Sequence, residues 1–91
     1  MYLHVKPVGE VGDVEQGDPI ALLVEKKVEL VHSECVGGVM AVEDGGETVV
    51  LTCTKCEVRQ DLDRTEASDA LRRVLLYDEY AWAGDAGLLP D

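Results

Sequence analysis

The stretch that decides the fold is residues 32–56, HSECVGGVMAVEDGGETVVLTCTKC. It begins with the pair His32 and Cys35 and ends with the pair Cys53 and Cys56. Each pair has two residues between its members, and 17 residues separate the two pairs. Structural zinc ions take four cysteine or histidine ligands in a tetrahedron, and close pairs are a common source of them. The spacing therefore predicts one structural zinc ion per chain, held by His32, Cys35, Cys53 and Cys56.

The residues between the two pairs have the pattern of a β-hairpin. Segments 39–43 (VMAVE) and 48–52 (TVVLT) are rich in β-branched residues, and they flank the cluster 44–46 (DGG). Such a cluster suits the positive φ values of a tight turn. A hairpin here would bring its two ends together, and with them the two ligand pairs.

Two ligand pairs joined by a hairpin resemble the zinc ribbon family over residues 30–60, about a third of the chain. Gly37 and Gly38 after the first pair also fit that family, although His32 stands where a cysteine is more usual. Imidazole and thiolate ligands mix in structural zinc sites. Four protein ligands leave no position for an activated water, so we expect a structural site. The alternative is that His32 is an ordinary strand residue and the cysteines are small buried apolar side chains.

The other segments predict a mainly β fold with one C-terminal α-helix. Residues 2–8, 20–24 and 28–31 have the alternation or β-branched content of strands, and 61–64 is polar and expected to be a linker. A helix is expected over 65–83, capped by Asp63 or Thr65 together with Glu66. It is indicated by apolar residues at helical spacing, namely Ala67, Ala70, Leu71, Val74, Leu75 and Trp82.

The chain is thus expected to form a single domain, 1–91. In that domain, a β-rich N-terminal layer (1–31) and a zinc ribbon (32–60) precede the helix (65–83). At 91 residues without phenylalanine, the core has to be built from small aliphatic side chains, which favours an added metal.

The composition of the chain limits the kinds of partner it is expected to bind and the cellular compartment in which it is expected. A net charge of −11 opposes binding to nucleic acid or to anionic membranes, and it reflects either a high-salt habitat or a basic partner. Three cysteines, an odd number with one close pair, fit a metal site better than disulfides and indicate a reducing compartment. No apolar run approaches the roughly 20 residues that cross a bilayer. We expect the cytoplasm, or a particle assembled there.

No catalytic site is expected, because the chain has two histidines, no recognised nucleophile motif and no phosphate-binding glycine loop. The leading hypothesis is a non-enzymatic zinc-binding adaptor or regulator. Its protein partner would contact Tyr77, Tyr80 and Trp82 or the apolar tail at 88–90, since tyrosine and tryptophan are enriched at interfaces.

Two other hypotheses stay open. One is a structural subunit of a repeating assembly such as a virus particle, which implies a homo-oligomer or lattice. The other starts from residues 9–29, whose Gly-Asp and Gly-Asp-Pro turns resemble barrel-sandwich hybrid domains, the fold of biotinyl and lipoyl carriers. That resemblance implies a modified lysine, and Lys27 is the candidate.

Overall fold

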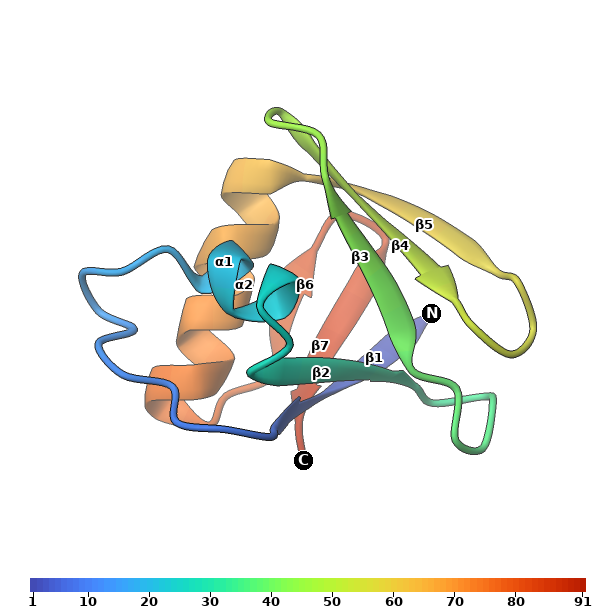
Figure 1. The fold of residues 1–91 in the computed structure, drawn as a ribbon, viewed down its shortest axis with the longest axis horizontal. Helices are drawn as coiled ribbons and strands as arrows, with labels where there is room; N and C mark the ends of the chain where they lie inside the picture. The colour runs from blue at the N-terminus through green and yellow to red at the C-terminus, as the bar shows by residue number, and fades with distance from the viewer.

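Two β-sheets and two α-helices make up the chain, for which a computed structural model describes all of residues 1–91 (Figure 1). One sheet has four strands in the order β2-β1-β7-β6, and the other has three in the order β3-β4-β5. The strands are β1 (Tyr2–Pro7), β2 (Val28–His32), β3 (Met40–Asp44), β4 (Thr48–Cys53), β5 (Arg59–Asp63), β6 (Ala81–Ala83) and β7 (Ala86–Pro90), and the helices are α1 (Pro19–Val24) and α2 (Arg64–Tyr77). The predicted class, mainly β with one C-terminal helix, is confirmed.

The four-stranded sheet joins the two ends of the sequence. β1 runs antiparallel to β2 and parallel to β7, with Tyr2 opposite Gly87 and Val5 opposite Pro90. The apolar tail at 88–90, predicted to contact a protein partner, is part of the inner strand β7 of this sheet. The β-layer predicted for residues 1–31 is completed by residues from the opposite end of the chain.

The three-stranded sheet contains the predicted hairpin, because β3 and β4 pair antiparallel around a turn in which Gly46 has φ +90°. The predicted linker at 61–64 is wrong, since β5 pairs antiparallel with β4 along its whole length. Leu62 is the only buried residue of β5. A strand with one apolar contact shows no alternation in sequence, because backbone bonds to its neighbour hold it in place.

The strand predicted at 20–24 is wrong, because residues 19–24 form the helix α1. Asp18 caps this helix by accepting a hydrogen bond from the Ile20 N–H at 3.0 Å, and Pro19 occupies its first turn. Ile20, Leu22 and Leu23 are buried. A short apolar run does not distinguish a strand from a buried helix, whereas an Asp-Pro start is typical of helices.

The C-terminal helix ends earlier than the predicted 65–83. Asp78 has φ +55° and its N–H donates to the Val74 carbonyl, which ends α2 at Tyr77. Trp82, predicted on the helix's apolar stripe, lies in β6. At the start, Asp63 accepts from the Glu66 N–H as predicted. The Glu66 carboxylate accepts instead from the Gly84 N–H, which ties the β6–β7 turn to the first turn of α2.

The apolar core lies between α2 and the two sheets, with α1 beside α2 (Figure 1). α2 contributes its buried stripe, and the sheets contribute alternate inward residues. The largest buried side chains are aliphatic, with Leu3, Leu30, Leu51, Leu71 and Leu88 among them. Neither helix is long and apolar enough to cross a bilayer.

Candidate metal centre

The four predicted ligands lie in two turns at the same end of the molecule. His32 is the last residue of β2 and Cys53 is the last residue of β4, while Cys35 and Cys56 lie in the turns that follow these strands. One atom from each residue, a ring nitrogen of His32 and the Sγ of each cysteine, lies within 4.8 Å of all the others. The structure therefore brings all four together in a cluster that could hold a metal ion.

The distances suit a single ion. Ligand sulfurs around a tetrahedral zinc ion at 2.3 Å are about 3.8 Å apart, and Cys56 Sγ lies 3.6 Å from Nδ1 of His32. All three cysteines are free thiols in the structure, with no disulfide between them. The alternative was that the cysteines are small buried apolar side chains. Only Cys53 is buried, whereas Cys35 is half-buried and Cys56 is exposed.

Backbone hydrogen bonds shape the first turn. The Cys35 N–H donates to the His32 carbonyl, the Gly38 N–H donates to the Cys35 carbonyl, and the His32 N–H donates to the Gly38 carbonyl. Gly37 has φ +74°, a conformation that favours glycine. The turn thus reverses the chain between β2 and β3 while directing His32 and Cys35 to one side.

The second turn is built in a similar way. The Glu57 N–H donates to the Cys53 carbonyl, and the Cys53 N–H donates to the Val58 carbonyl. Lys55 joins the two turns, since its Nζ donates to the Val36 carbonyl at 2.8 Å. Sequence reasoning did not assign a role to Lys55, although its place between two ligand cysteines was a usable signal.

Gly38 leaves room for the sulfurs. A Cβ at this position would lie 2.9 Å from the Sγ of both Cys35 and Cys53, closer than non-bonded atoms normally approach. The second glycine of the Gly37-Gly38 pair is therefore required by the sulfur cluster, and the first by its backbone conformation.

The electrostatics of the cluster favour a bound cation. The N–H groups of Cys56 and Lys55 point at the Cys53 sulfur and lower the pKa of Cys53 to about 6, which favours the thiolate form that binds a cation. Burial raises the pKa of Cys35, and the neighbouring sulfurs of Cys53 and Cys56 raise it further. A cation among the sulfurs would remove this repulsion. Because Nδ1 of His32 faces Cys56, Nε2 is left near Glu34, 3.9 Å from its carboxylate.

The predicted aromatic surface is only partly correct. Tyr80 and Trp82 contact each other with ring centroids 5.3 Å apart, but their third member is Tyr2, at 6.1 and 5.9 Å. Tyr77 ends α2 and lies outside this group, which we call the aromatic cluster (Tyr2, Tyr80 and Trp82). The rings cover the backbone of Gly87, where a Cβ would meet Tyr2 at 2.6 Å. All three are more than two-fifths exposed.

Lys27, the candidate carrier lysine, follows α1 directly and lies outside any hairpin tip. Its ammonium is 3.7 Å from the Glu25 carboxylate. Residues 20–24, which were predicted to form a strand before this lysine, belong to the helix α1.

Comparison of the chain with protein families, with curated proteins and with solved structures found no match.

Proposed function

We propose that this chain is a zinc-ribbon-like protein in which one structural zinc ion supports a small domain that works by binding another protein. The observation that carries the first part is the convergence of one imidazole and three sulfurs within 4.8 Å of one another. Soft thiolate and imidazole donors in a tetrahedral set are the ligands that zinc prefers.

Zinc at this position would be structural. Its four donors come from the protein, so no coordination position is left for a substrate or an activated water. The ligands come from two separate turns, and metal binding would supply free energy that holds these turns together. This favours a non-enzymatic role. Free thiolates and zinc are compatible with a reducing compartment such as the cytoplasm.

The aromatic cluster supports the second part of the proposal. Trp82 is 53% exposed and stands with Tyr2 and Tyr80 on the face of the four-stranded sheet opposite α2. Exposed tyrosine and tryptophan side chains that are held together by mutual packing are typical binding hot spots. A protein of charge −11 is best matched by a basic partner surface.

Metal analysis tests the zinc site. Protein purified without chelator is expected to carry about one zinc per chain. When the zinc is replaced by cobalt, the protein should show the visible absorption of tetrahedral cobalt bound to thiolates. Replacing His32, Cys35, Cys53 or Cys56 should remove the metal, whereas Ser33→Ala, between two ligands, should retain it. Full zinc retention in all four ligand variants would overturn this part, and loss in only some of them would change the ligand set.

A photo-crosslinking residue tests the partner. Placed at position 82 and expressed in the native cell, it is expected to capture one defined protein, while the same residue at the exposed position 36 should not. Capture of a second copy of the chain, together with a large solution mass, would favour the structural subunit of a repeating assembly. An intact mass above that of the sequence and its zinc would instead favour a carrier.

A further inference from the structure

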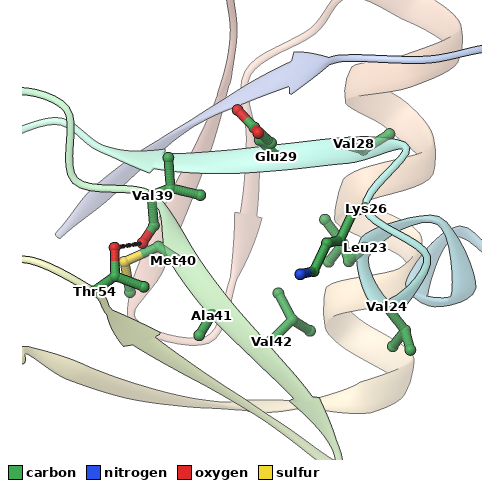
Figure 2. A pocket seen from close by; sticks show the side chains of 10 residues that line it. All are labelled: Leu23, Val24, Lys26, Val28, Glu29, Val39, Met40, Ala41, Val42 and Thr54. Carbon is green, nitrogen blue, oxygen red and sulfur yellow. Dashed lines mark hydrogen bonds between the residues drawn. The ribbon is translucent and has the colours of Figure 1, made fainter.

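A groove of about 350 Å³ opens between β2 and β3, where the two sheets meet (Figure 2). The two strands contact each other at one end through the bridge between Val31 and Val39, and they diverge toward the C-terminal end of α1. Seven of the ten lining residues are hydrophobic, so the groove is mainly apolar. It is distinct from the metal cluster and from the aromatic cluster.

Both walls of the groove are sheet edges. On β3, the hydrogen bonds from Gly45 to the Thr48 carbonyl and from Thr54 to the Val39 carbonyl mark residues whose backbone groups face β4. In an antiparallel pair, successive residues direct these groups to opposite sides. Val42 is three residues from Val39 and three from Gly45, so its backbone groups face the opposite way from theirs. Its N–H and C=O therefore point away from β4, toward the groove.

The same rule applies to β2. The Lys27 carbonyl accepts from the Val8 N–H at the end of β1, so the next residue, Val28, directs its backbone groups away from β1. Free donors and acceptors thus face the groove from both strands. Because both residues lie on extended strands, a second extended backbone is the ligand that matches their free groups.

The other two edges of the sheets are protected. β6 has only three residues, and the free edge of β5 carries the ion pair between Arg59 and Asp61. Short strands and charged side chains are the usual ways in which proteins prevent strand pairing at an edge. On β3, the charged residues Glu43 and Asp44 are confined to the end of the strand, while Met40, Ala41 and Val42, which line the groove, are uncharged and leave this part of the edge open to pairing.

We propose that this groove binds an extended segment of a partner protein, which pairs with the free edge of β3 and places alternate apolar side chains in the groove. The outward side chains of the segment are expected to be basic along β3, since the exposed Glu43 follows Val42 and the chain has a charge of −11. The groove itself is lined by one residue of each charge, Glu29 and Lys26, so its interior is expected to take the apolar side chains. The same charge on two copies opposes pairing of β3 with itself.

The probe is an acetylated and amidated hexapeptide of alternating valine and lysine, added to the intact metal-loaded protein. Amide hydrogen exchange measured by NMR should show Val42 unprotected in the free protein and protected when the peptide binds. Binding should weaken as salt is added, because part of the attraction is between exposed charges. A peptide with N-methyl groups on the amides that face β3 keeps the side chains but loses the donors, and it should bind at least about fivefold more weakly.

Val42→Pro removes the free donor without removing a bond to β4 and should lower peptide affinity about fivefold to tenfold. Asp61→Pro is the matched control, because Asp61 has an equivalent free N–H on the opposite edge of the same sheet. Val42→Thr retains the amide and the β-branched shape. Asp61→Pro should bind like wild type, as should Trp82→Ala, which separates this inference from the proposed role of the aromatic cluster. Val42→Thr, which changes a side chain that lines the groove, should still bind more tightly than Val42→Pro.

Three results would overturn the inference. The first is the absence of Val42 protection at millimolar peptide. The second is equal affinity for the N-methylated peptide, which would indicate a pocket for apolar side chains alone. The third is a dimer of the free protein that Val42→Pro dissociates, which would identify a second copy as the occupant.

Discussion

The helix side of this molecule and its His/Cys end are held together in different ways. On the helix side, Ala67, Ala70, Leu71 and Val74 of α2 are buried against the sheets in a continuous apolar layer. At the other end, two turns meet through one imidazole and three sulfurs, while the neighbouring Val36 is 91% exposed. The first region is stabilised by a wide apolar layer, whereas in the second only His32 and Cys53 of the four ligands are buried.

The difference explains how a chain of 91 residues without phenylalanine can extend two turns beyond its core. Stabilisation by apolar burial grows with the surface removed from water, so it is weak where few side chains meet. A metal site needs only four atoms in the right places and can contribute several kcal/mol. If the two regions are independent, loss of the metal should leave the apolar layer packed, and a cavity in that layer should leave the metal bound.

The largest effect is expected at the His/Cys end. Cys53→Ser should abolish zinc binding and lower the free energy of unfolding by about 4 kcal/mol when the wild type is measured at free zinc 1,000 times its dissociation constant. Chemical denaturation with and without chelator measures this. Ser33→Ala should unfold like wild type. A Cys53→Ser protein as stable as the zinc-loaded wild type would mean that the turns are held by other contacts.

On the helix side, Leu71→Ala should lower the free energy of unfolding by about 3 kcal/mol, since Leu71 is 1% exposed and its removal leaves a cavity. The zinc content per chain should not change. Leu76→Ala, at an exposed position of the same helix, should cost less than about 1 kcal/mol. If Leu71→Ala released the metal, the two regions would be coupled.

Gly38→Ala should weaken metal binding about tenfold, because the added Cβ meets two sulfurs at 2.9 Å and displaces them from the ion. Competition with a coloured zinc chelator measures the affinity. Gly9→Ala is the matched control, since its Cβ would have no contact closer than 3.9 Å. Unchanged affinity in Gly38→Ala would place the metal away from Cys35 and Cys53.

Asp63→Ala should cost about 1 kcal/mol, because it removes the side chain that accepts the Glu66 N–H at the start of α2. Thermal unfolding at fixed zinc measures the loss. Asp61→Ala removes only an exposed ion pair with Arg59, and it should cost less than about 0.5 kcal/mol. Equal losses in the two variants would exclude capping as the cause.

The smallest effect is a pH dependence. The Arg64 guanidinium, which donates to both oxygens of Asp44, lowers the pKa of that carboxyl, and the Gly46 N–H lowers it further. A carboxyl with a lower pKa in the folded state stabilises it above the unfolded pKa of about 4, and this contribution is lost as pH falls through the folded value. Asp44→Asn should therefore flatten the acid limb of stability against pH. If the acid limb were unchanged, the loss of stability at low pH would be caused by other carboxyl groups.

The ligand cluster could be predicted from sequence because its information is local. Two close pairs with a hairpin between them identify the four ligands and indicate that the hairpin brings the pairs together. The turn of the hairpin is recognisable in the sequence from its two glycines. Gly38 could be noticed in the same way, although only the positions of the sulfurs explain it.

The errors have the opposite origin. β5 is held by the backbone of β4, and its single buried residue, Leu62, leaves no pattern to detect. α1 is too short for its period to be distinguished from that of a strand, so the usable signal was its start, Asp18 followed by Pro19. Tyr2 could not be placed beside Tyr80 and Trp82, because the strand pairing that joins them crosses most of the chain.

That pairing has a consequence for the way this protein is made. β1 lies between β2 and β7 in the sheet. In a growing polypeptide, β1 can pair with β2 early, but it can pair with β7 only after residues 86–90 have left the ribosome. Contacts of such long sequence separation slow folding. The N-terminal strand therefore spends synthesis with one side unpaired, and the last strand to emerge completes the sheet.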